Sequence, residues 1–269
     1  MPRNQGVCAV KNSNSFIKSY KKLARFDLLK IKKTTMKKTI WSHFIQGFVI
    51  FSSVLLSLYL GNLNNRSTEK DKKNNYITDL SLSLKEDISQ IQSLINILNE
   101  SENLITELQN DLDNANFNLN EDKVINNILN IEVGFSFFPQ DGVYNQMIST
   151  GSFELITNDD LKKNLLEMYN HQMARNYATS LEIDNFNLTF RADPYDQFRI
   201  RFDYNLLEGA FYGKRKLTSY NFNDSYYESN SFYGLLSQAK LYANMYRRQL
   251  SDILISYEET VLLCRQEVM

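Results

Sequence analysis

The sequence has few of the residues from which metal sites and many active sites are built. Of its 269 residues two are cysteine, Cys8 and Cys264, and two are histidine, His43 and His171. It contains no Cys-x-x-Cys or His-x-x-x-His pair, no glycine-rich phosphate loop and no nucleotide-binding fingerprint. Sequence context supports no Ser-His-Asp arrangement. We therefore expect no enzyme, no metal site and no cofactor.

Long apolar runs are also absent, with one exception. Residues Ile40 to Leu60 contain no Asp, Glu, Lys or Arg. A helix of that length covers the roughly 30 Å of hydrocarbon in a bilayer. A signal peptide would have an apolar region of about 7–15 residues followed by a small-x-small cleavage site, whereas this run is longer and ends in Ser-Leu-Tyr-Leu-Gly-Asn. The pattern favours an uncleaved transmembrane anchor at 40–60, in contact with the lipid bilayer.

Charge is distributed unequally around this anchor. Residues 1–38 carry eleven Lys or Arg against one acidic residue, whereas from Gly61 onward there are nineteen basic and thirty acidic residues. Because basic residues accumulate on the cytoplasmic side of a membrane span, we expect the N-terminus inside and Gly61 to Met269 outside. Cys8 and Cys264 then lie on opposite sides and cannot pair within one chain. The outer part is therefore no disulfide scaffold, and Cys264 is expected to be a buried small hydrophobe.

The basic arm, residues 1–39, has no clear hydrophobic period. Met36-Lys-Lys-Thr-Ile-Trp looks like an ordinary cytoplasmic start to an anchor, so Met36 is the expected physiological start. If the arm is translated, its basic side chains could hold anionic headgroups, each contributing about 1 kcal/mol near the surface. Topogenic charge without a specific ligand is the simpler interpretation. No fold or motif for nucleic-acid binding accompanies the arm.

Polar residues share one face of the expected span. They are His43, Gln46, Ser53 and Ser57, and Ser53, Ser57 and Gly61 form a small-xxx-small series. Such a face can approach another helix closely and hydrogen-bond across it. Two interpretations are open: the face mediates self-association or docking to a membrane partner, or an anchor simply tolerates a few hydroxyls.

After a polar collar at 61–75, the outer domain, 76–269, is patterned for helices. The first long helix carries apolar residues three or four apart, interrupted at Glu102, which favours packing within the chain over a coiled coil. Its face is Ile77, Leu80, Leu84, Ile88, Ile91, Ile95, Leu98, Ile105, Leu108 and Leu112. Shorter helices are expected at about 121–131 and 143–149, and further long helices at 159–187 and 231–267.

Two more apolar stripes define the later long helices. The first is Leu161, Leu165, Tyr169, Met173, Tyr177 and Leu181, and the second is Leu235, Ala239, Tyr242, Tyr246, Ile253, Tyr257, Val261 and Cys264. Asn158 is the expected N-cap of the helix from 159, and Gly151 the expected stop of the helix before it. The run Asp111 to Asp122 is a poor match to a calcium loop and fits better as Asn-rich turns that end one helix and cap the next. His171 is expected to be structural or on the surface.

Aromatic residues are dense between Phe186 and Tyr233. Phe198, Ile200, Phe202 and Tyr204 alternate with polar residues, so this segment could form a strand that pairs with 217–222. An irregular connection laid over the helices is the favoured interpretation. These aromatics fit the cap of a core better than a partner surface.

The Met-Lys-Lys-x-Ile-Trp start, the single span, the helix beginning at 76–87 and the segment Ile148-Ser-Thr-Gly-Ser-Phe-Glu-Leu-Ile-Thr-Asn-Asp-Asp-Leu161 resemble a family of single-span membrane proteins common in flavobacteria. That family carries only a domain-of-unknown-function label. The resemblance implies a bacterial inner-membrane protein, single-pass, with a helical periplasmic domain, and it implies no catalytic residues.

The expected fold is all-α: one N-terminal transmembrane helix, then an extracytoplasmic antiparallel bundle of three long helices with short helices and an aromatic-rich connection. The expected function is a binding, scaffold or assembly component of the cell envelope, whose partner is an envelope protein or a second copy, with no small-molecule ligand evident. One alternative is an accessory sensor subunit that signals through a partner. The other is an envelope enzyme that uses the carboxylates Asp193, Asp196, Asp203 and Glu208.

Overall fold

The structure, a computed structural model, describes residues 13–114, 118–205 and 214–268, with side chains from Trp41 onward except that of Lys214. It is mostly helical, at 82%, and its described strands form one small two-stranded sheet. The chain divides into two compact units, residues 1–67 (unit 1) and 68–269 (unit 2). The predominantly helical fold expected from the sequence is therefore confirmed.

Unit 1 contains the N-terminal part of helix α1 (Ser13–Asp113), which begins within the arm that shows no sequence period. In the described part of the chain one helix is long and apolar enough to cross a membrane, by length and composition. None of its apolar window is buried, and Phe44 and Phe48 are 73% and 66% exposed. Within unit 1, no described residue therefore covers this apolar surface.

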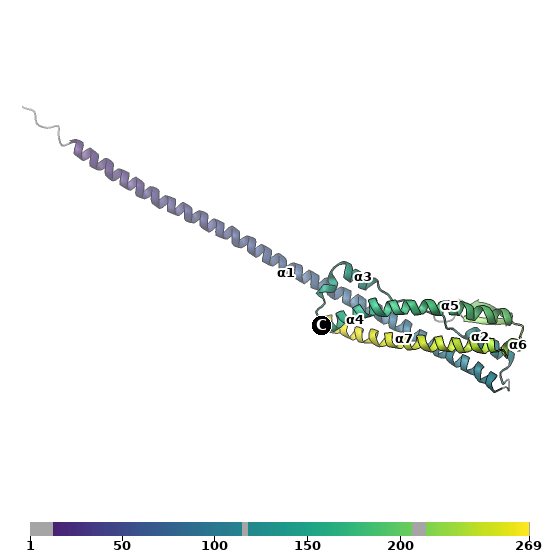
Figure 1. The fold of residues 1–269 in the computed structure, drawn as a ribbon. Coiled ribbons are helices and arrows are strands. Elements are labelled where there is room, and N and C mark those ends of the chain that lie inside the picture. The colour runs from purple at the N-terminus through teal and green to yellow at the C-terminus, as the bar shows by residue number, and fades with distance from the viewer. Residues whose placement is uncertain (1–12, 115–117, 206–213, 269) are drawn as a thin grey trace, which may run out of the picture. The chain divides into compact units, whose positions relative to one another are not determined.

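Unit 2 begins with the rest of α1, which runs without a break through the expected collar at 61–75. The collar is exposed as far as Lys72, and Lys73 is buried. The elements that follow α1 (Figure 1) are α2 (Glu121–Asn130), α3 (Gly142–Ser149), the 3₁₀-helix η1 (Ser152–Leu155), α4 (Asp159–Leu166), the π-helix η2 (Glu167–Gln172), α5 (Met173–Gln197), β1 (Arg201–Asn205), β2 (Lys214–Ser219), α6 (Asp224–Tyr227) and α7 (Asn230–Val268).

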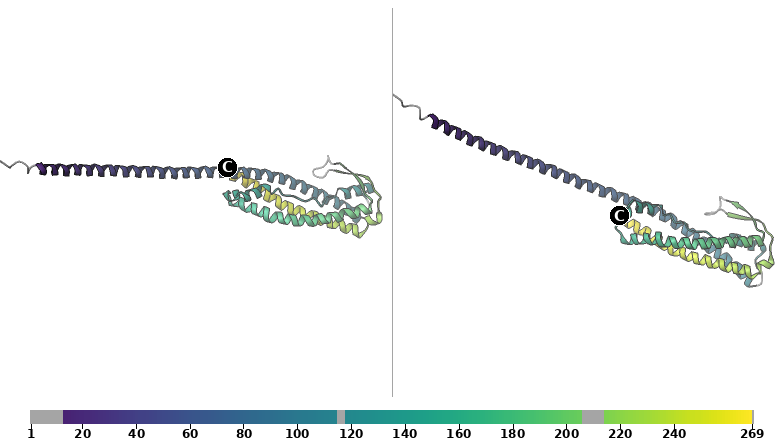
Figure 2. Two further views of the ribbon diagram at one scale, coloured as in Figure 1. Left: turned by 90° about the horizontal axis from the view of Figure 1, so that it is seen from above. Right: turned by 45° about the horizontal axis from the view of Figure 1, so that its top comes forward.

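Contacts along the helices of unit 2 fix their directions. Helix α7 runs opposite to α1, because Lys73 pairs with Glu267 near one end and Asp111 accepts a hydrogen bond from Tyr227 near the other. Helices α4 and α5 run in the same direction as α1 (Figures 1 and 2). This is possible because α2 and the extended residues 131–141 carry the chain back between them. The sequence pattern predicted α2, at about 121–131, but left the rest of the returning segment unassigned.

One hydrophobic core joins these elements. In α1 most of the expected apolar face is buried, with Ile77, Leu84 and Ile91 fully inaccessible, and α7 buries Ala239, Tyr246, Ile253 and Tyr257 from its expected stripe. A fully buried Leu or Ile contributes roughly 1.5–3 kcal/mol relative to an exposed one. Cys264 is 1% exposed, which confirms its expected burial.

The apolar stripe expected on the second long helix is wrong in its later half. Tyr177 and Leu181 are 71% and 54% exposed, whereas Asn176 and Ser180 are buried. An α-helix turns about 100° per residue, so a stripe drawn with a spacing of four drifts by about 40° at each step. The π-helix at Glu167–Gln172 adds a further local change of register. The helix also continues to Gln197, beyond the expected 187.

Three local signals read from the sequence are confirmed. The Asn120 side chain accepts from Lys123 N at the start of α2, and the Asn158 side chain accepts from Leu161 N at the start of α4. Gly151, after α3, has a φ of 72°. That conformation suits glycine, because it has no Cβ to clash in the left-handed region.

The favoured irregular connection between 198 and 222 is wrong, because β1 and β2 form an antiparallel hairpin in which Phe202 opposes Leu217. Leu217 packs against the core, and Thr218 Oγ1 donates to Arg201 O at 2.9 Å. The strand β1 has only five residues, and an alternating pattern of that length is too short to predict the pairing from sequence. Contacts between residues far apart in sequence also hold the hairpin. Arg215 of β2 pairs with Glu132, which also pairs with Arg191.

The aromatic-rich stretch forms part of the core, as expected. Phe198, Tyr227 and Phe232 are at most 2% exposed. Their rings, with those of Phe222 and Tyr226, contact one another at centroid distances between 5.2 and 5.8 Å. Edge-on and tilted pairs at these distances are favourable aromatic geometries.

Candidate functional site

The polar face of the apolar helix is exposed along its whole length. His43, Gln46, Ser53, Ser57 and Gly61 are all accessible. Ser53 Oγ donates to Ile50 O at 2.8 Å, within its own helix, and a Cβ built on Gly61 meets no atom within 4 Å. No described residue therefore covers this face, for which the sequence leaves both helix association and simple tolerance of hydroxyls open.

The carboxylates of the catalytic alternative have structural partners or lie apart. Asp193 accepts from Tyr226 Oη at 2.7 Å, and Asp203 of β1 stands opposite Lys216 of β2. Asp196 is in the last turn of α5, and Glu208 lies outside the described residues. Among the described side chains, those of residues 41–114, 118–205 and 215–268, no group of three from His, Cys, Asp or Glu could hold a metal ion.

The remaining candidate residues are an imidazole and a thiol. His171 is exposed in the π-helix, as the sequence analysis expected. Burial raises the pKa of the Cys264 thiol to about 12, and the carboxylate of Glu267 adds to this. A thiol with such a pKa is almost entirely protonated near neutrality, so Cys264 is a poor nucleophile.

A pocket of about 640 Å³ lies between the start of α2 and the segment that joins β2 to α7. Two parts of the chain about a hundred residues apart therefore build it. Its lining is Leu119, Asn120, Glu121, Asp122, Val124, Tyr220, Phe222, Asp224, Tyr227 and Glu228. We call these residues the α2–α6 pocket.

The charge of the α2–α6 pocket is entirely negative. Its lining includes four carboxylates and no Lys, Arg or His. Glu121 and Asp122 belong to the first turn of α2, and Asp224 belongs to the first turn of α6. A helix N-terminus contributes only about half a positive charge, so these termini do not neutralise four carboxylates. Glu228 follows α6 and has no such structural explanation.

The aromatic wall of the pocket is supported by a fifth, buried carboxylate. Tyr227 Oη donates to Asp111 Oδ2 at 2.7 Å, and Leu119 N donates to Asp111 Oδ1 at 2.9 Å. Burial raises the pKa of Tyr227, and the bond to Asp111 raises it further. Burial also raises the pKa of Tyr220, with Glu121 and Asp122 adding to the shift. Both phenols therefore stay protonated beside the pocket.

A second polar cluster holds the returning segment 131–141 against the helices. Tyr246 Oη accepts from Phe137 N at 2.7 Å and donates to Asn176 Oδ1 at 3.1 Å, while Asn176 Nδ2 donates to Phe137 O at 2.8 Å. The three residues thus form a closed ring of hydrogen bonds. Because an extended segment cannot satisfy its own backbone, these side chains supply the partners.

Asp87 of α1 lies in the same region and is 1% exposed. Its Oδ2 accepts from Gln140 N at 3.0 Å, and its Oδ1 has no hydrogen-bond partner among the described residues. Burial raises the pKa of the Asp87 carboxyl to about 6, while the bonds from Gln140 oppose the rise. Desolvation therefore outweighs the hydrogen bonds at this carboxyl.

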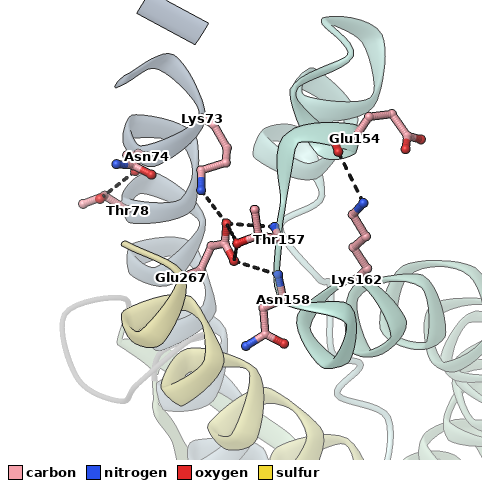
Figure 3. A network of polar contacts seen from close by, with 8 residues as sticks. All are labelled: Lys73, Asn74, Thr78, Glu154, Thr157, Asn158, Lys162 and Glu267. Atoms are coloured by element: carbon pink, nitrogen blue, oxygen red, sulfur yellow. Dashed lines mark hydrogen bonds and ion pairs between the residues drawn. The ribbon is translucent and has the colours of Figure 1, made fainter. Parts of the chain in front are cut away.

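Glu267, near the end of α7, makes a third polar cluster (Figure 3). Its carboxylate pairs with Lys73 of α1 and accepts from the backbone N–H groups of Thr157 and Asn158 at 3.0 and 2.9 Å. Burial alone raises the pKa of Glu267, but these hydrogen bonds outweigh it, and the pKa lies below its usual value. The cluster joins α1, α7 and the turn before α4.

Sequence reasoning did not find the pocket or the Asp111 hydrogen bonds beside it. It also did not find the hydrogen bonds around Tyr246 or those around Glu267. The α2–α6 pocket left one signal: Tyr220, Phe222 and Tyr227 alternate along the chain with Asp224 and Glu228. The other wall, Glu121 and Asp122, is identifiable only as an acidic first turn. Comparison with protein families, with curated proteins and with solved structures finds no match to this chain.

Proposed function

We propose that the chain is a single-span membrane protein whose outer unit is a binding component of the cell envelope. The observation that carries this proposal is the bare apolar surface of α1. Its window is uncharged enough to cross a membrane and none of it is buried. Exposed apolar area of this extent needs lipid or a protein to cover it.

The orientation is N-terminus inside, with 61–269 on the outer side. The excess of basic residues before the span supports it. The resemblance to flavobacterial single-span proteins supports an anchor in the bacterial inner membrane and an outer unit in the periplasm. Membership of that family is part of the proposal.

The outer unit, in this proposal, is a bundle in which α1, α4–α5 and α7 surround one core, with α7 antiparallel to the other two. Binding is favoured over catalysis because Asp193 and Asp203 already face protein partners. The α2–α6 pocket, by contrast, has free volume and a lining whose negative charge no basic lining residue compensates. A tether that carries a pocket suits capture or assembly at a membrane surface.

The test uses engineered cysteines in a chain whose Cys8 is replaced by serine. Lys163, exposed on α4, is changed to cysteine and treated in intact spheroplasts with a membrane-impermeant maleimide. We expect labelling of Lys163→Cys without lysis, whereas Thr39→Cys, between Met36 and the span, is labelled only after lysis. The protein should also stay in the membrane pellet after alkaline carbonate extraction. Labelling of Lys163→Cys only after lysis, or release by carbonate, would overturn the proposal.

A further inference from the structure

We infer that the α2–α6 pocket binds an organic cation, an alkylammonium or guanidinium group held between carboxylates and aromatic rings. This assigns a ligand class to the binding function proposed above and therefore rests on it. The inference depends on the coincidence of a cavity, a negative lining and ring faces in one place.

The volume of the pocket suits a small organic molecule better than a bare metal ion. At about 640 Å³ the pocket falls within the roughly 300–1,000 Å³ range of small-molecule sites. A divalent cation would instead need three or more ligating side chains within about 2.6 Å of one point. The described residues offer no such group.

The negative charge of the pocket lining favours a positively charged ligand. Four lining carboxylates, without a basic side chain among the lining residues, make an anion unfavourable and a cation favourable. Glu121 and Asp122 of α2 belong to one wall of the pocket, and Asp224 and Glu228 belong to the other; all four side chains are exposed. A cation placed between the walls would therefore meet carboxylates from both sides.

The rings select an organic cation over a hydrated inorganic one. Tyr220 and Phe222 are half-buried, so part of each ring is available to a ligand, and Tyr227 lies behind them. A cation over an aromatic face gains about 0.5–2 kcal/mol.

Two sources offer the same chemistry: a free amine, or a Lys or Arg side chain presented by an envelope protein. The full chain in lipid nanodiscs is titrated by calorimetry at physiological salt, where distant surface charges are screened. The probes are choline, agmatine and an Arg-containing pentapeptide. The matched control for choline is its neutral isostere 3,3-dimethylbutanol, which has the same shape without the charge.

We expect choline to bind at least tenfold more tightly than its neutral isostere. Tight binding of choline or agmatine would indicate a free amine as the ligand, and preference for the peptide would indicate a protein partner. Either result supports the inference. Binding of neither the amines nor the peptide, or equal binding of choline and the isostere, would overturn it.

Variants locate the binding in the pocket. Glu228→Gln and Phe222→Leu should each weaken binding about three- to tenfold, since each removes one carboxylate or one ring. Glu258→Gln, an exposed carboxylate of α7 outside the pocket, should leave affinity unchanged. Equal affinity of all three would contradict the assignment. Because binding in nanodiscs does not depend on orientation in the cell, a failure here differs from a failure of the spheroplast labelling.

Discussion

Helix α1 contains two apolar regions with opposite surroundings. Between Trp41 and Leu60 nearly every apolar side chain is exposed, as at Phe48, 66%, whereas beyond Thr68 the apolar residues Leu84 and Ile91 are fully buried. The first region is apolar over most of its circumference, apart from the polar face of His43, Gln46, Ser53 and Ser57, and the second is apolar on one face only. A continuous apolar surface matches a lipid environment, and a stripe matches a protein core.

The largest effect should come from placing a charged side chain in either apolar region of α1. In one region it should change the stability of unit 2, and in the other the insertion into the membrane. Leu84→Asp buries an unpaired carboxylate in the core, and we expect it to lower the free energy of unfolding of unit 2 by more than about 4 kcal/mol. Leu55→Asp should leave that free energy unchanged but raise the cost of membrane insertion by about 3 kcal/mol. Thermal unfolding followed by circular dichroism and carbonate extraction measure the two outcomes. Equal destabilisation of unit 2 by both changes would contradict the comparison.

The next largest effect is expected at the closed ring of hydrogen bonds among Tyr246, Phe137 and Asn176 in the core. Tyr246→Phe removes the hydroxyl that accepts from Phe137 N and donates to Asn176. Because each buried polar group left without a partner costs about 1–3 kcal/mol, we expect a loss of about 2–4 kcal/mol in urea unfolding. The control is Tyr242→Phe, which removes an exposed hydroxyl bonded to Glu182 and should cost less than about 1 kcal/mol. Similar losses would show that the ring of hydrogen bonds does not stabilise the core.

A smaller, pH-dependent effect is expected at Asp87. Its folded pKa, about 6, lies above the usual 3.8, so the folded state favours the protonated form. Stability from this group is fully present below about pH 4 and is lost as the pH rises through 6. Asp87→Asn keeps the shape without the charge, so it should raise the unfolding free energy by about 1–3 kcal/mol at pH 8 and by much less at pH 4. Asp252→Asn, at an exposed position, is the control; a difference that does not change with pH would refute the prediction.

The sequence predicted the parts of the fold that follow from local patterns. The caps at Asn120 and Asn158, the stop at Gly151 and the faces of α1 and α7 depend on residues within a few positions of one another. Contacts such as Glu267 to Thr157, or Tyr246 to Phe137, join residues more than a hundred positions apart. No period marks such pairs, so the returning segment, the polar clusters and the walls of the pocket could not be predicted.

The smallest effect is expected at the polar face of the span. If another helix packs against this face, both regions of α1 have one face that is covered by protein. If Ser53, Ser57 and Gly61 pack against another helix, replacing all three by leucine separates the backbones and removes hydrogen bonds worth about 0.6 kcal/mol each. We expect association in a membrane reporter assay to weaken by about 1–2 kcal/mol. Replacing Leu55, Leu56 and Leu58 by isoleucine keeps the span equally apolar and is the control. Unchanged association of the serine–glycine variant would mean that lipid alone covers this helix, and the span would then act only as a tether.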